Sequence, residues 1–349
     1  MNDIKIGYVA LNSDLHVSPG DYRRFVYYAK SKGIKFDQAT VGKKYDLVIL
    51  SQGADVSLWK DYPHGVVVYD LIDSYLSLPR NNIKALLRGF MKYILGKNEK
   101  LYFSYWHLIQ KMCQRSDMVL CSTVEQKDEI SPFCKNVPII LDFHDDVVRD
   151  YKSDYCIGEK IKIVWEGLPS NLYQLKFIRK VLLTLSRKYN IELHVITDLS
   201  STVLFGKYNL TSTESRVKKI FTNSVVHKWS KESFSEIACQ CDIAVIPIDT
   251  AFILNRNKPE NKLLLFWRMG IPTITSSTPA YSRTMQGAGL DLACDSDNDW
   301  LKNIEKLIKY KQDREISAIK GSAYADKEFG TKKILDEWDK AFRSVGFEF

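Results

Sequence analysis

Two kinds of hydrophobic pattern alternate along the chain. Short runs rich in Val and Ile, bounded by turn residues, predict buried β-strands, and apolar positions three and four residues apart predict helices. Strands are expected at 4–11, 46–51, 65–72 and 117–123, and then at 161–167, 191–198, 217–226, 242–249 and 272–277. Helices are expected between them, two of them at about 172–188 and 231–240.

Strands that alternate with helices predict parallel sheets covered by helices on both faces. The series occurs twice, so the pattern predicts an α/β protein with two doubly wound domains. The length of 349 residues agrees, because a single core rarely grows beyond about 250–300 residues. We expect an N-terminal domain at 1–150, a second domain at 151–330, and a helical tail at 331–349 that crosses back to the first domain.

Composition indicates an ordinary globular chain, with 45% hydrophobic and 26% charged residues. No apolar run approaches the roughly 20 residues that span a bilayer, and Asp3 and Lys5 interrupt the place where a secretory signal needs an apolar stretch. We therefore expect a cytoplasmic protein. The seven cysteines form no CxxC pair and the six histidines are scattered, so free thiols and no metal site are expected.

The positive charge is concentrated in one segment. The chain carries a formal net charge of +8, and residues 80–115 hold eight cations against one acid, Glu99. Apolar residues recur at three- and four-residue spacing between Ile83 and Ile94, while Lys84, Arg88 and Lys92 follow one another at intervals of four. This pattern predicts an amphipathic cationic helix, and we expect residues 80–110 to suit the surface of an anionic membrane. A packed helix with a solvated basic face is the alternative.

A second group of cations surrounds the start of a predicted helix. Asn257 and Glu260, with Pro259, form a helix-start signature, and Gly270 marks the end of this helix. Arg256, Lys258 and Lys262 gather at its N-terminus, where the helix dipole is already positive. A bound diphosphate would make this arrangement favourable. The alternative is that the cations are solvated and that Glu260 only caps the helix.

The segments DIAVIPID (242–249) and KPENKLLLFWRMGIPTITSS (258–277) resemble the nucleotide-binding half of GT-B glycosyltransferases. The resemblance is to the large retaining family of bacterial polysaccharide enzymes. Lys262 falls on the family lysine, and Gly270 and Pro272 fall on its Gly-x-Pro. The family's two glutamates correspond to Asn257 and Leu265, so the Glu pair is missing and Glu260 is a candidate for a displaced carboxylate. The resemblance covers most of 161–340 and, more weakly, 1–150.

This resemblance implies two Rossmann-like domains facing across a cleft, and a metal-independent, retaining transfer from a nucleoside-diphosphate sugar. UDP and GDP are the expected nucleotides, and no further cofactor is expected. Lys262, with Arg256 and Lys258, would stabilise the leaving diphosphate. Further candidate donor-binding residues are Gly167, His227, Glu260, Asn261, Leu263, Ser276 and Ser277.

The first domain of such an enzyme binds the acceptor and supplies a general base. Asp70 and Asp73 follow the third predicted strand, at the carboxyl end where these sheets place their sites. The alternative for Asp73 is a cap on a helix that begins at Ser74.

The expected function is sugar transfer to a lipid-linked or oligosaccharide acceptor in bacterial surface-polysaccharide synthesis. A sugar-nucleotide epimerase of similar fold and a non-enzymatic nucleic-acid-binding protein are the alternatives. The nucleic-acid alternative is disfavoured because the basic charge is confined to one amphipathic segment without a known nucleic-acid-binding motif.

Overall fold

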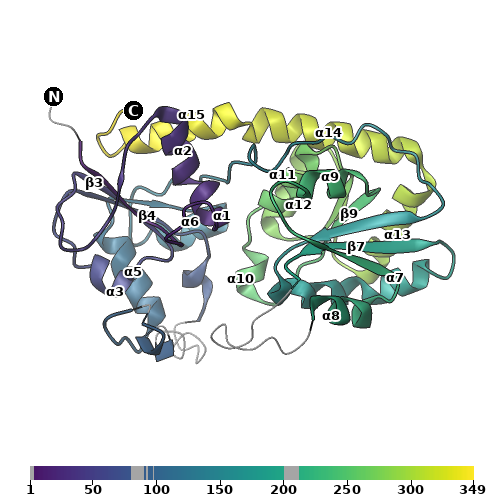
Figure 1. Cartoon of the computed structure of the whole chain (residues 1–349), viewed down its shortest axis with the longest axis horizontal. Coiled ribbons are helices and arrows are strands. Elements are labelled where there is room, and N and C mark those ends of the chain that lie inside the picture. The colour runs from purple at the N-terminus through teal and green to yellow at the C-terminus, as the bar shows by residue number, and fades with distance from the viewer. Residues whose placement is uncertain (1–3, 80–89, 92, 97, 200–211) are drawn as a thin grey trace. The chain divides into compact units, whose positions relative to one another are not determined.

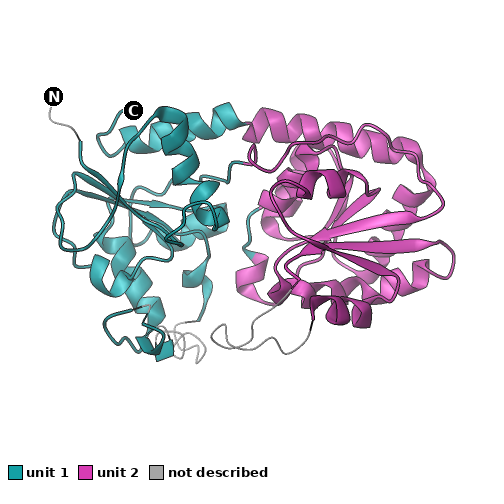
Figure 2. Cartoon of the chain, in the orientation of Figure 1, with its two compact units in different colours: residues 1–143, 257–259, 331–349 teal, residues 144–256, 260–330 magenta. Residues whose placement is uncertain are grey.

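The computed structural model describes residues 4–79, 90–91, 93–96, 98–199 and 212–349, and it divides the chain into two compact units (Figures 1 and 2). The first unit comprises residues 1–143, 257–259 and 331–349, and the second comprises 144–256 and 260–330. Each unit is built around one parallel sheet. The described part of the chain contains no helix that is both long and apolar enough to cross a membrane.

The sheet of the first unit has the strand order β2-β1-β3-β4-β5 and is parallel throughout. This is the flavodoxin-type order, in which the chain reverses direction between β1 and β3. Four of its strands lie where the hydrophobic runs predict them, whereas β2 is an exposed pair of residues that no such run marks. The strands are β1 (Ile6–Val9), β2 (Asp37–Gln38), β3 (Leu47–Ser51), β4 (Val66–Asp70) and β5 (Met118–Leu120).

Short helices connect these strands, and side-chain caps mark where several of them begin. Ser104 accepts a hydrogen bond from the backbone of His107, and Thr123 accepts one from the backbone of Gln126. The helices of this unit whose bounds lie within the described residues are α1 (Pro19–Tyr22), α2 (Phe25–Lys32), α3 (Val56–Trp59), the 3-10 turn η1 (Tyr75–Ser77), α5 (Tyr105–Arg115), α6 (Val124–Ile130) and α15 (Thr331–Arg343).

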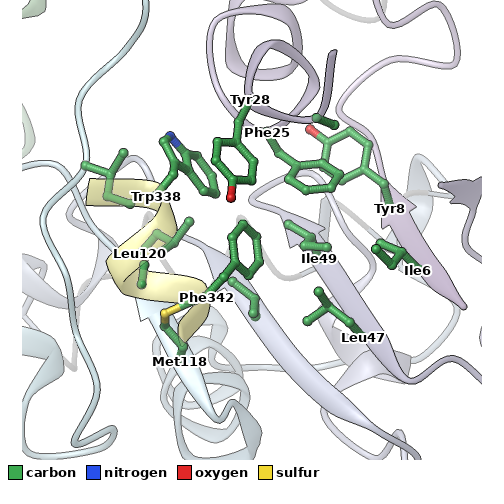
Figure 3. Close-up of a cluster of buried hydrophobic side chains, with 14 of the residues drawn as sticks. Ile6, Tyr8, Phe25, Tyr28, Leu47, Ile49, Met118, Leu120, Trp338 and Phe342 are labelled. Carbon is green, nitrogen blue, oxygen red and sulfur yellow. The ribbon is translucent and has the colours of Figure 1, made fainter. Parts of the chain in front are cut away.

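The C-terminal helix α15 completes the core of the first unit. Ile334, Trp338 and Phe342 recur every four residues and are almost fully buried, as expected for the apolar face of an amphipathic helix. The rings of Trp338 and Phe342 stack on Tyr28 of α2, each with centroids 5.3 Å apart (Figure 3). Residues from both ends of the chain therefore share one hydrophobic core.

The sheet of the second unit has the order β11-β10-β9-β6-β7-β8. Counted from β6, this is the Rossmann order 3-2-1-4-5-6 seen from the other edge, so the chain changes direction between β6 and β9. In doubly wound folds, ligands bind outside the carboxyl ends of the strands at such a switch point. The strands are β6 (Ile161–Glu166), β7 (Ile191–Thr197), β8 (Ser224–Lys228), β9 (Ile243–Ile246), β10 (Thr273–Ser276) and β11 (Ala293–Cys294).

Helices lie on both faces of this sheet (Figure 1). The strand predicted at 217–226 is wrong in its first half, where Val217 and Ile220 are buried one helical turn apart on a helix capped by Ser212. The predicted helix at 172–188 begins instead as a long 3-10 segment. The helices are η2 (Pro169–Ile178), α7 (Arg179–Leu185), α8 (Thr213–Ile220), α9 (Phe234–Cys239), α10 (Ile253–Arg256), α11 (Asn261–Arg268), α12 (Pro279–Gly287), α13 (Asp297–Lys309) and α14 (Lys311–Phe329).

Helix α11 begins later than its sequence signature predicts. Its N-cap residue is Glu260, whose side chain makes no capping hydrogen bond, so a capping box starting at Asn257 is wrong. The predicted end is confirmed, because Gly270 adopts a φ of 68° and a methyl group there would lie 2.7 Å from the ring of Tyr151. Residues 263–267 are all buried, since α11 packs against β9 and β10 and also against α14.

Candidate functional site

Lys262 lies at the carboxyl edge of the second unit's sheet, beside the switch point. It is the second residue of α11, and its ammonium donates a hydrogen bond of 2.7 Å to the backbone oxygen of Glu166, the last residue of β6. The same nitrogen lies 3.3 Å from Glu166 Oε2 and 5.5 Å from the ring centroid of Trp165. The packing of α11 thus places a cation where Rossmann-type sheets bind the phosphates of nucleotides.

Glu166 is a residue that the sequence interpretation missed. Its carboxylate is a counter-ion for Lys262, so this lysine is already paired within the fold, contrary to the expectation that its charge is uncompensated. The signal that could have found it is its position as an acidic residue at the end of the central strand. The hydrophobic pattern places Glu166 only in the strand expected at 161–167.

The other two cations are placed differently. Arg256 is the exposed last residue of the short helix α10 in the second unit. Lys258 is half-buried and belongs to residues 257–259, which are part of the first unit. Within that unit, the buried amide of Asn257 donates to Ser77 Oγ at 2.9 Å and to Glu129 Oε1 at 3.0 Å. Asn257 therefore anchors this segment rather than the start of α11.

The first residues of α11 separate into accessible and inaccessible positions. Glu260 is half-buried, and its Oε1 accepts a 3.2 Å hydrogen bond from Thr284. Asn261 is half-buried as well. The side chain of Leu263 is fully buried in the core, so this residue could contribute to donor binding only through its backbone.

Three further candidate residues make hydrogen bonds within the carboxyl edge of the sheet: Gly167, Ser276 and Ser277. The backbone N–H of Gly167 donates to the backbone oxygen of Ile196, so it is not available as a hydrogen-bond donor to a ligand. A methyl group at Gly167 would lie 2.8 Å from Lys262 Nζ, which shows that the glycine makes room for the lysine. The buried hydroxyl of Ser276 accepts from the backbone of Ile248 at 2.8 Å, and Ser277 hydrogen-bonds to Asp295.

His227 lies on the same face of the sheet as Glu166, but it is engaged with another histidine. Strand register aligns Glu166 with Ile196 and Ile196 with His227. The His227 ring stacks on His194 with centroids 5.1 Å apart, and the two nearest ring nitrogens are 2.9 Å apart. The other nitrogen of His194 lies 3.2 Å from Glu192. Burial lowers the pKa of both histidines, and in His194 the charge of His227 lowers it further.

In the first unit, Asp70 serves the core. It accepts two 2.7 Å hydrogen bonds from the guanidinium of Arg24, which also pairs with Asp142 at 3.1 Å. Burial alone would lower the pKa of Arg24, but the carboxylates of Asp70 and Asp142 raise it, so Arg24 stays charged. Asp70 is 2% exposed and both of its oxygens are occupied, so the structure argues against Asp70 as a general base.

Asp73 is the accessible carboxylate of this edge. Its Oδ2 accepts hydrogen bonds from Gln52 at 3.3 Å and from the Tyr75 hydroxyl at 3.1 Å, while its backbone N–H donates to Gln52. Its side chain does not cap the turn η1, whose N-cap residue is Ser74. Gln52 directly follows β3, so Asp73 lies near the switch point between β1 and β3.

The predicted basic helix lies mostly outside the described residues, which omit Arg80, Lys84, Arg88, Lys92 and Lys97 among others. The described residues that follow carry six exposed apolar or aromatic side chains, each between 40% and 74% exposed. These form what we call the 90–103 apolar cluster: Phe90, Tyr93, Ile94, Leu95, Leu101 and Phe103.

No protein-family model matches the sequence, and no curated protein matches it. Solved structures do match. Anabaena HepE, solved in complex with UDP and glucose, has a TM-score of 0.65 at 10% identity, covering 98% of this chain and 100% of HepE. TarM of S. aureus has a TM-score of 0.59 at 9% identity over 86% of this chain, which spans only 55% of TarM.

A third match is a putative UDP-N-acetylglucosamine 2-epimerase from Listeria monocytogenes, with a TM-score of 0.54 at 11% identity and 99% of both chains covered. At such low identities these similarities establish the fold and nothing finer. The predicted α/β fold with two Rossmann-like domains is thus confirmed.

The stacked histidine pair predicts a pH-dependent stability. Because folding lowers both pKa values below the value of about 6.5 for a free histidine, the unfolded chain binds protons more readily as the pH falls. Stability should be constant above about pH 7 and decrease as the pH falls below about 6.5. The melting temperature, measured as a function of pH, reports this loss of stability. We expect His227→Gln to lose less melting temperature than the parent as the pH falls. His16→Gln, at an exposed site, should behave like the parent. Identical pH profiles for His227→Gln and the parent would contradict this expectation.

Proposed function

We propose that the chain is a glycosyltransferase that uses a nucleoside-diphosphate sugar, with UDP or GDP as the nucleotide. The observation that carries this proposal is the ammonium of Lys262 at the carboxyl end of β6, beside the switch point of a Rossmann-order sheet. The similarity in fold to HepE, which was solved with UDP and glucose, supports the choice of ligand.

In the proposed reaction, the bond between the anomeric carbon and the diphosphate oxygen breaks, and the acceptor oxygen bonds to the anomeric carbon. Negative charge accumulates on the diphosphate as it leaves, and Lys262, with Arg256 of the same unit as a further cation, would stabilise it. Cationic side chains can supply this stabilisation, so the proposal requires no bound metal. The resemblance to a retaining family favours retention at the anomeric carbon.

The acceptor hydroxyl must lose its proton, and we assign this to Asp73. Its carboxylate is half-buried and oriented by Gln52 and Tyr75, which are neutral donors. A carboxylate whose described partners are neutral remains able to accept a proton, whereas Asp70 is paired with the guanidinium of Arg24.

The proposed acceptor is lipid-linked, or an oligosaccharide, in bacterial surface-polysaccharide synthesis. The 90–103 apolar cluster supports a lipid-linked acceptor, because six exposed apolar and aromatic side chains within 14 residues fit a hydrocarbon surface better than water. Residues 80–100 also carry six cations in the sequence, which complement anionic headgroups. We therefore propose peripheral contact with the cytoplasmic face of an anionic membrane.

An epimerase acting on the sugar nucleotide is the second candidate, favoured by the likeness to the Listeria protein over the full length of both chains. An epimerase would convert one sugar nucleotide into another without an acceptor. It would release no net nucleoside diphosphate and would form no glycoside. Product analysis therefore separates the two candidates.

Replacing Lys262 with Ala should weaken UDP or GDP binding by about 10- to 100-fold, because a charge-assisted hydrogen bond contributes about 1.5–3 kcal/mol. Isothermal titration calorimetry with each nucleotide measures this effect. Lys302→Ala, at an exposed position of α13, is the matched control and should bind like the parent. Equal nucleotide affinity in Lys262→Ala and the parent would exclude the diphosphate site proposed here.

Asp73→Asn should leave nucleotide affinity unchanged and reduce transfer by about 10²- to 10⁴-fold, the usual contribution of a general base. The assay measures how fast the nucleoside diphosphate is released from the sugar nucleotide that the parent protein consumes. Asp37→Asn, exposed on β2 of the same unit, is the control. If Asp73→Asn turned over at the parental rate, Asp73 would have no part in the chemistry.

The double substitution Ile94→Ser and Phe103→Ser should weaken binding to phosphatidylglycerol vesicles at least about tenfold, since burial of each large apolar side chain contributes about 1.5–3 kcal/mol. The matched control replaces Phe177 and Ile319, which are 48% and 61% exposed in the second unit. Flotation with these vesicles and with phosphatidylcholine vesicles, at low and high salt, provides the measurement. Salt-sensitive binding to DNA in preference to either vesicle would support the nucleic-acid alternative instead.

A further inference from the structure

The pairing of Lys262 with Glu166 bears on which anions the site accepts. We propose that Glu166 is a specificity-determining residue that rejects ligands offering only phosphate oxygens and favours ligands that also bring hydroxyl donors. This inference rests on the proposed function, because it takes Lys262 as the residue that binds the diphosphate.

The contacts of Lys262 show how much of its ammonium is already occupied. An ammonium has three N–H donors. One donates to the backbone oxygen of Glu166 at 2.7 Å, and the carboxylate of the same residue lies 3.3 Å away. The side chain of Glu166 is 17% exposed and that of Lys262 is 35% exposed, so the pair is only partly screened by water. Together the two side chains carry no net charge.

A phosphate that binds Lys262 must approach the ammonium to about 3 Å, which brings it close to the Glu166 carboxylate. Two negative groups at such a distance repel each other, and the repulsion is stronger at a partly dry edge than in bulk water. Ionised phosphate oxygens are acceptors only and have nothing to offer the carboxylate in return. Inorganic pyrophosphate carries no alcohol hydroxyl that could take their place.

A ligand with hydroxyl groups can donate hydrogen bonds to the Glu166 carboxylate and so replace the contact with Lys262 that the carboxylate loses. A carboxylate accepts hydrogen bonds at both oxygens, and the vicinal hydroxyls of a ribose or a hexose are suitable donors. A nucleoside diphosphate therefore gains hydrogen bonds from alcohol hydroxyls, which pyrophosphate lacks. Because the partly buried carboxylate would otherwise lose a partner, this difference favours the nucleotide.

A second carboxylate adds to the negative character of this edge. Burial, followed by the charges of Glu260 and Glu166, raises the pKa of the fully buried Tyr281, so both carboxylates act on the same neighbour. Glu260 is oriented by Thr284 at 3.2 Å and contributes to the same discrimination. Glu166 remains the decisive residue because it directly contacts Lys262.

The experiment compares UDP with inorganic pyrophosphate by calorimetry in metal-free buffer, using the full chain. Glu166→Gln keeps the shape of the side chain and removes its charge. We expect it to bind pyrophosphate about tenfold more tightly than the parent, and its affinity for UDP to change less, so the preference for UDP falls. Glu166→Asp, which keeps the charge, should retain most of the preference. Glu192→Gln, a comparably buried ion-paired carboxylate (12% exposed) on β7, should leave both affinities unchanged.

The possible results separate this inference from the proposed function. If UDP binds the parent in a Lys262-dependent manner but Glu166→Gln leaves the affinity for pyrophosphate unchanged, or raises both affinities equally, the role of Glu166 is refuted and the nucleotide site stands. If neither ligand binds the parent or any variant that melts like the parent, both ideas are refuted.

Discussion

The burial of α11 is the constraint on which the candidate site depends. Residues 263–267 all face protein, with the sheet on one side and α14 on another, so the helix cannot rotate or slide without exposing Phe266 or Trp267. The close packing of Trp267 against Gly321, where a methyl group would lie 2.7 Å from the indole, makes this constraint strict. The position of Lys262 over the end of β6 follows from the packing of its apolar neighbours.

Acidic side chains at the strand ends have very different roles, and their partners decide which. Asp70 neutralises the buried Arg24 and belongs to the architecture. The side-chain donors to Asp73 among the described residues, Gln52 and Tyr75, are neutral, and we propose Asp73 for proton transfer. Glu166 has a cation that a ligand can compete for. Three carboxylates at the same kind of edge thus differ because the groups that fold against them differ.

The two positions that the resemblance matches to glutamates, Asn257 and Leu265, both have structural roles. Leu265 is buried in the core of the second unit, so this position could not hold a carboxylate facing a ligand. Asn257 is committed to Ser77 and Glu129 of the first unit. The acidic groups that remain near Lys262 are Glu166 and Glu260, and they come from a strand end and a helix cap.

The sequence by itself determined the repeated alternation of strands and helices, because hydrophobic runs and helical spacing are local properties of the chain. It also determined the end of α11 at Gly270 and the helical character of the tail that contains α15. It misplaced the start of α11 and the strand at 217–226, because capping and burial of an amphipathic turn depend on what packs nearby.

Only the tertiary structure decided which charged groups meet. Glu166 and Lys262 are 96 residues apart in sequence, and Arg24 and Asp70 are 46 apart, so no local pattern reveals either pair. The order of the strands and the burial of the helices bring these residues together. Local spacing encodes the elements of this protein, whereas long-range packing decides which of its carboxylates and cations are available for chemistry.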